Sequence, residues 1–199
     1  MGTTIFLVIV LGIIFYVISV YNRLVNLRNR VKNAFSQIDV QLTRRYDLIP
    51  SLVETVKGYM QHERDTLEAV IAARNNAVEG LKAAALDPSN GDTIQALAAA
   101  ETALGGSLTK LMALVEAYPD LKANETMARL QEELSSTENK VAFSRQAFND
   151  SVLMYNNACQ NFPDNLIAKQ FTFKAAEYLE IESETKRSVP EVSFDTGGA

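Results

Sequence analysis

The chain has 199 residues, of which 47% are hydrophobic, so it can bury one sizeable core and hardly a second. Its formal net charge of -5 argues against a nucleic-acid-binding protein, which would usually present a basic face. A single cysteine, Cys159, excludes an intrachain disulfide, so cysteine usage does not reveal the compartment.

The N-terminal segment has the length and composition of a transmembrane helix. No charged side chain occurs in residues 3–22, and about 20 helical residues cross about 30 Å of hydrocarbon. A cleaved signal peptide is the alternative, but residues 1–4 lack the basic side chains it requires and Ser19-Val20-Tyr21 is a poor cleavage site. We therefore predict a transmembrane helix over residues 4–22, after a short extracytoplasmic N-terminus of residues 1–3.

Basic residues lie just after this predicted span and none precedes it. They are Arg23, Arg28, Arg30 and Lys32. By the positive-inside rule, the C-terminal side of the span is cytoplasmic. The expected localisation is the cell membrane, with a single pass, the N-terminus outside and the rest of the chain in the cytoplasm.

The region after the span predicts long helices. Neither Gly nor Pro occurs between Gly12 and Pro50, so we expect the membrane helix to continue as a stalk to about Tyr46. Asp47 is a plausible N-cap and Pro50 fits the first turn of a helix, which predicts that a second helix begins near Leu48.

Two further breaks divide the remaining helical pattern. The Asp87-Pro88-Ser89-Asn90-Gly91-Asp92 cluster predicts a loop. An Ala-rich third helix follows over about residues 93–118, and the pair Gly105-Gly106 should weaken or bend it. Pro119-Asp120 predicts the next break, and apolar residues at steps of three and four predict a fourth helix as far as about Asn161.

These elements predict the fold class and the domain organisation. Short loops make neighbouring helices antiparallel, so we expect an all-α protein whose transmembrane helix continues into an antiparallel up-and-down four-helix bundle over residues 23–162. Residues 163–199 are predicted to form a C-terminal strap and tail. In this part we expect a short helical turn over residues 164–169, an aromatic strap packed on the bundle, and a mobile tail after about Glu182.

Four charged residues lie at or near the apolar stripes and form a predicted structural polar seam. Glu63 and Arg74 belong to the second helical pattern, and Glu138 and Arg145 belong to the fourth. A lone buried charge would cost several kcal/mol, so we expect these residues to form buried ion pairs that fix the register of the helices. A polar binding pocket inside the bundle is the functional alternative.

Several motifs, spread over nearly the whole chain, identify a family. They are Tyr21-Asn22-Arg23-Leu24-Val25, Asp39-Val40-Gln41-Leu42, Arg45-Tyr46-Asp47-Leu48-Ile49-Pro50-Ser51-Leu52-Val53, His62-Glu63, Ala73-Arg74, Tyr118-Pro119-Asp120-Leu121-Lys122-Ala123-Asn124, Leu130-Gln131-Glu132-Glu133-Leu134, Thr137-Glu138-Asn139, Arg145, Phe148-Asn149-Asp150, Tyr155-Asn156 and Phe162-Pro163. This set closely resembles the bacterial LemA family. The resemblance implies a bacterial, membrane-anchored helical bundle with no established biochemical activity. Some members carry a lipoprotein cysteine before the Tyr-Asn pair, but Val20 stands there in this chain.

The sequence contains no convincing catalytic, cofactor-binding or metal site. His62-Glu63 begins like a zincin motif, but Thr66 stands where the second His is needed and the chain has one His in all. Cys159 lies in an apolar stripe without a partner base nearby in sequence. The carboxylates of the fourth helix lack the Glu-x-x-His element of di-iron bundles, so a solvated face is the expected interpretation.

Two functional hypotheses remain. The first is a non-enzymatic scaffold or interaction module that self-assembles into a homo-oligomer, or binds other proteins, at the cytoplasmic face of the lipid bilayer. The second is an accessory or regulatory subunit of a membrane enzyme such as a membrane protease, with that enzyme as its membrane-protein partner. Neither hypothesis involves a cofactor or nucleic acid.

Overall fold

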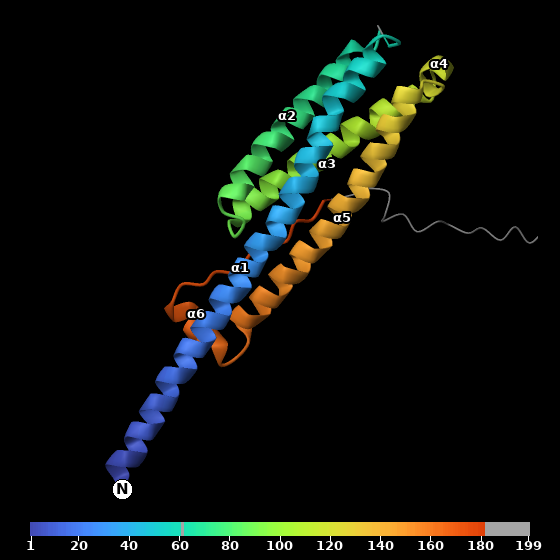
Figure 1. The fold of residues 1–199 in the computed structure, drawn as a ribbon. Coiled ribbons are helices and arrows are strands. Elements are labelled where there is room, and N and C mark those ends of the chain that lie inside the picture. Colours follow the sequence, from blue (N-terminus) through green and yellow to red (C-terminus); the bar gives the residue numbers. More distant parts are fainter. Residues whose placement is uncertain (61, 182–199) are drawn as a thin grey trace, which may run out of the picture.

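The computed structural model describes residues 1–60 and 62–181, and all regular secondary structure in these residues is helical (Figure 1). The helices are α1 (Gly2–Lys57), α2 (Arg64–Leu86), α3 (Gly91–Val115), α4 (Pro119–Lys122), α5 (Glu125–Gln160) and α6 (Asp164–Gln170). The predicted all-α class is therefore confirmed for the described part of the chain.

Helix α1 joins the apolar N-terminal segment to the core without a break. It is 56 residues long, and it is the one helix among the described residues that is long and apolar enough to cross a membrane. Almost none of its apolar window is buried. A core helix of equal hydrophobicity would be covered by its own fold, so the exposure of this window favours a membrane span.

The predicted helix boundary at Asp47 is wrong, because α1 continues through Pro50 to Lys57. A proline has no N–H to donate to the carbonyl four residues before it, which leaves the carbonyl of Tyr46 without its helical partner. Arg74 of α2 donates its Nε–H to this carbonyl at 3.2 Å. Packing in the core also stabilises the helix beyond Pro50, because Ile49, Leu52 and Val56 continue the buried stripe of α1.

The helices pack as two pairs, α1 with α5 and α2 with α3, and the contact between α1 and α2 joins the pairs (Figure 1). Helix α1 lies along α5 and along α2, and α2 lies along α3. A Cβ added at Gly80 of α2 would lie 3.4 Å from the Cα of Leu97 in α3, so small residues bring these two helices close together. Between α1 and α5, the rings of Phe35 and Phe148 meet edge to face at 5.7 Å.

The predicted loops are largely confirmed. Helix α2 ends at Leu86, and α3 begins after Asn90, whose side chain accepts a hydrogen bond from the Asp92 amide at 3.0 Å. Helix α3 is continuous through Gly105 and Gly106. Helix α5 begins after Asn124, another side-chain N-cap.

Part of the segment predicted to form a strap lies within the described residues. Residues 173–181 have no regular secondary structure and lie on α5, where the side chain of Asn156 both donates to the carbonyl and accepts from the amide of Ala176, each at 2.9 Å. Asn149 forms the same kind of pair with Leu179, at 3.3 and 2.9 Å. Ala176 and Leu179 are buried in the core. The predicted mobile tail after Glu182 lies outside the described residues.

Candidate functional site

A buried polar cluster lies between α1 and α3. Arg45 of α1 donates to Oε2 of Glu101 in α3 at 3.0 Å, and the hydroxyl of the adjacent Tyr46 donates to Oε1 of the same carboxylate. The side chains of Arg45 and Glu101 are 8% and 0% exposed. Both carboxylate oxygens therefore have a charged or hydroxyl donor inside the hydrophobic core.

Burial dominates the electrostatics of this cluster. Burial raises the pKa of the Glu101 carboxyl. The Arg45 guanidinium and the Tyr46 hydroxyl act in the opposite direction and lower this pKa, and the negative charge of Glu138 adds to the increase. Burial also raises the pKa of Tyr46, and the neighbouring Glu101 raises it further. Tyr46 therefore keeps its proton and remains a hydrogen-bond donor to the carboxylate.

The arrangement suits a structural role better than a chemical one. Glu101 is enclosed and both of its oxygens are occupied, so no face of the carboxylate is open to a substrate. Among residues 1–60 and 62–181, no three His, Cys, Asp or Glu side chains come together as a metal site would require. Cys159 is partly buried, and burial raises the pKa of its thiol, which disfavours the nucleophilic thiolate.

The four seam residues predicted from the sequence do not form the pairs expected of them. Arg74 lies 3.9 Å from Asp47 and donates to the Tyr46 carbonyl. Glu138 is 69% exposed and lies 3.9 Å from Arg45, at the edge of the buried cluster. Glu63 immediately precedes α2, and Arg145 is partly buried on α5.

Sequence reasoning missed the two residues that do form the buried ion pair. Glu101 stands in the same stripe as four buried apolar residues of α3. They are Ile94, Leu97, Leu104 and Leu108. This register is the signal that could have revealed Glu101. The burial of Arg45 is harder to predict. The next residue, Tyr46, already fills the position that continues the apolar stripe of α1, so the pattern gives no reason to expect Arg45 to be buried as well.

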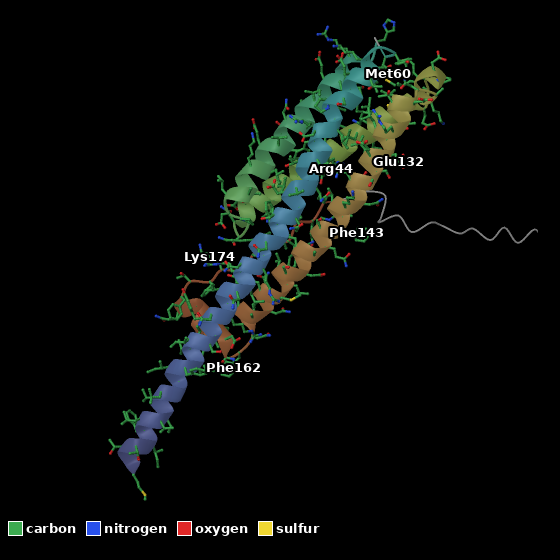
Figure 2. All side chains as sticks on the ribbon, in the orientation of Figure 1. Arg44, Met60, Glu132, Phe143, Phe162 and Lys174 are labelled. Carbon is green, nitrogen blue, oxygen red and sulfur yellow. The ribbon has the colours of Figure 1, made fainter. Side chains whose placement is uncertain are left out.

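A second feature is an open groove at the end of α1 farthest from the span. It has a volume of about 990 Å³ and lies between the last turns of α1 and the first turns of α2. It is lined by Pro50, Val53, Glu54, Lys57, Met60, Arg64, Leu67, Glu68, Ile71, Ala72 and Asn75. Figure 2 labels Met60 at this end of the molecule.

The lining of this groove is apolar in its floor and charged at its rim. Met60 and Leu67 are buried beneath it, while exposed ion pairs Arg64–Glu68 at 2.7 Å and Lys57–Glu54 at 3.7 Å stand around it. Such a combination fits the apolar face of an amphipathic helix from a protein partner.

The comparisons with known proteins agree with a membrane-associated helical protein. The sequence matches the model of the LemA family over residues 34–194. It is 26% identical over 174 residues to the magnetosome protein MamQ of Magnetospirillum gryphiswaldense, covering 80% of this chain and 64% of that protein. A second relative, magnetosome protein MamQ 2 of Paramagnetospirillum magneticum, has the same identity and coverage over 175 residues.

A third relative is similar over more of its length. Protein LemA of Metamycoplasma hominis is 22% identical over 187 residues, which cover 90% of this chain and 81% of that protein. In contrast, the chain spans less than two thirds of the length of the two MamQ relatives. None of these names states an enzymatic activity.

Proposed function

The chain belongs to the LemA family, and from that premise we propose that it is a single-pass membrane protein whose helical bundle is a non-enzymatic scaffold for protein binding. The observation that carries the proposal is α1, which contains the exposed apolar segment at one end and contributes to the open groove at the other. From Arg23 to Lys57, at 1.5 Å per residue, α1 would hold the groove about 50 Å from the membrane.

The proposed domain organisation follows the helices. Residues 1–3 precede the span of residues 4–22, residues 23–162 form an antiparallel four-helix bundle, and residues 163–199 are the strap and tail. Support for the bundle comes from α1, α2, α3 and α5, which contribute to one hydrophobic cluster. The chain reverses direction at the loop after each of the first three.

The proposed localisation is the bacterial inner membrane, with the N-terminus outside and the bundle in the cytoplasm. Basic side chains follow the apolar segment of α1, as the positive-inside rule requires of a cytoplasmic flank. Arg23 and Arg30 are exposed on this flank. The match to bacterial relatives supports the bacterial setting.

We also propose that copies of the chain assemble through the outer face of α3. Ala96, Ala99, Ala103 and Gly106 are exposed and recur at steps of three and four, so they form a smooth ridge on that helix. Small side chains allow two helices to approach closely. The second candidate function, an accessory subunit of a membrane enzyme such as a protease, is favoured by the groove, which would then hold a helix of that enzyme.

Three matched variants separate these candidates, each replacing an exposed helical alanine by arginine. Ala72→Arg fills the groove, Ala99→Arg disrupts the α3 ridge, and Ala142→Arg on α5 is the control. Each full-length protein is purified from membranes in a mild detergent, and the mass and composition of the complex are measured.

Self-assembly predicts a homomeric complex that Ala99→Arg converts to monomer and that the control leaves intact. The accessory-subunit hypothesis predicts a stoichiometric enzyme that Ala72→Arg removes. A monomeric wild-type protein without any partner would contradict both, and catalytic turnover by the purified chain alone would contradict the non-enzymatic scaffold.

A further inference from the structure

Large apolar side chains are exposed at the end of the folded part nearest the span. Phe162, Leu166 and Phe171 are 80%, 61% and 46% exposed. They lie in the turn before α6, within α6 and directly after it. Figure 2 shows Phe162 at the end of the folded part from which α1 continues alone towards the N-terminus.

Helix α6 is fixed against α1 rather than loosely attached. Ile167 and Ala168 of α6 pack with Val20 and Leu24 of α1 in a separate small core. Phe171, which follows α6, packs edge to face on the ring of Tyr21 with centroids 5.0 Å apart.

A buried carboxylate sets the height of α6 along α1. Asp164, the first residue of α6, accepts from the Tyr16 hydroxyl at 2.9 Å and from Arg23 at 3.0 Å, and its side chain is 11% exposed. Tyr16 lies about 9 Å before residue 22, where the apolar segment ends. The start of α6 is therefore level with the last turns of that segment.

The other helix pair stays farther from this level. Helix α2 has 23 residues, about 35 Å at 1.5 Å per residue, and it begins beside the far end of α1, which extends about 50 Å beyond Arg23. The α2–α3 loop therefore stops short of the membrane. Figure 1 agrees, with α6 and the end of α5 lying closer to the N-terminus than that loop.

We propose that α6 and its flanks form a second membrane contact, in which Phe162, Leu166 and Phe171 insert into the lipid interface of the bilayer that α1 crosses. The inference rests on the proposed span of α1. Aromatic and apolar side chains are favoured at the boundary between headgroups and acyl chains. Lys169 of α6 is also exposed and suits anionic headgroups.

The carboxylate of Asp164 does not oppose this placement. A lone charge near the hydrocarbon would be costly, but this one is paired with Arg23 and hydrogen-bonded to Tyr16. The same pair ties the start of α6 to α1, so the three apolar side chains keep a fixed depth relative to the span.

The absence of tryptophan from the chain allows a direct test. Single tryptophans are introduced as Phe162→Trp and Leu166→Trp, with Phe143→Trp as the exposed control about 28 Å farther along α5 and Ile9→Trp as the reporter within the span. Each full-length variant is reconstituted into vesicles of phosphatidylcholine and phosphatidylglycerol, with bromine near either the carbonyl or the methyl end of the acyl chains.

We expect the emission of Phe162→Trp and Leu166→Trp to shift to shorter wavelength and to be quenched most by bromine near the carbonyl end. Quenching no stronger than in Phe143→Trp would overturn the inference. A blue shift without quenching would also overturn it, because it would indicate burial against another copy. Loss of quenching in Ile9→Trp would refute the span itself, whereas quenching there but not at the two α6 positions would refute the second contact alone.

Discussion

Glu101 is a carboxylate whose environment inside the core is set by two residues of α1, Arg45 and Tyr46. Removing one partner of a buried pair leaves the other charge without compensation. We therefore expect Glu101→Ala to lower the free energy of unfolding by about 3–5 kcal/mol. The double variant Arg45→Met/Glu101→Leu should lose less than Glu101→Ala in urea unfolding of the full chain in detergent.

The pH dependence of stability provides a separate test of the same carboxyl. Burial raises its pKa above the ordinary value of 4.5, so between these two values the folded protein binds more protons than the unfolded chain. The stabilising contribution of Glu101 is therefore fully present below pH 4.5 and declines as pH rises through the raised pKa. The free energy of unfolding of wild type minus that of Glu101→Gln should fall as pH rises above 4.5 and through the raised pKa.

A suitable control is Glu132→Gln, because Glu132 is exposed on α5 and is not among the groups that shift the pKa of Glu101. Its difference from wild type should depend much less on pH. A wild-type advantage over Glu101→Gln that grows with pH would mean that the folded protein stabilises the charged carboxylate more than water does.

Arg74 supplies the donor that Pro50 lacks, and this relation predicts a coupling between the two residues. Arg74→Met should cost about 1–3 kcal/mol, because the buried carbonyl of Tyr46 loses its partner. In a Pro50→Ala background the new amide can donate to that carbonyl, so the same substitution should cost less. Urea unfolding of the four proteins measures this coupling, and Arg129→Met on the exposed face of α5 is the control. Equal costs in both backgrounds would exclude it.

At the scale of the helix, apolar stripes predicted the buried faces well, whereas local N-cap and proline signals predicted helix boundaries less reliably. The stripe predicted the buried face of α5, and Asn90 and Asn124 begin helices where breaks were expected. The break predicted at Asp47 is absent, because the cost of Pro50 is offset by a side chain 24 positions away in Arg74 and by continued burial of α1. No local pattern contains that information.

The seam shows the same limit for side-chain pairing. Periodicity indicates which charged residues share a stripe with apolar ones, and Glu101 fits such a register. It does not indicate which side chain on another helix will meet it. The partners found for Arg74 and Glu138 come from α1, 27 or more positions away in sequence, and so could be identified only from the packed fold.

The strap is held to α5 by side chains that imitate the hydrogen bonding of a neighbouring strand. Asn156 satisfies both backbone groups of Ala176, which are buried. Asn156→Ala leaves them without partners, at a cost of about 1–3 kcal/mol. We expect faster hydrogen exchange at the Ala176 amide and at its neighbours, whereas the exposed Asn157→Ala should leave exchange unchanged. Equal protection in the two variants would show that other contacts hold the strap.

For the whole molecule, the proposed orientation is tested by cysteine labelling in a Cys159→Ser background. A cysteine at the exposed Ala83 of α2 should be protected from an impermeant thiol reagent in intact cells and should react after permeabilisation. A cysteine at Thr3 should react in intact cells. Labelling at Ala83 but not at Thr3 would reverse the proposed topology.

The unbroken course of α1 has a mechanical consequence. A flexible linker between a membrane anchor and a soluble domain lets the two parts rotate independently of each other. An α-helix without a break transmits rotation about its own axis. The direction in the membrane plane that the distal groove faces is therefore set by the rotation of α1 within the bilayer. Inserting one residue just before the folded part would advance the helix by about 100° and redirect the groove by the same angle. A protein that turns the anchor within the membrane would thereby turn the surface at its far end.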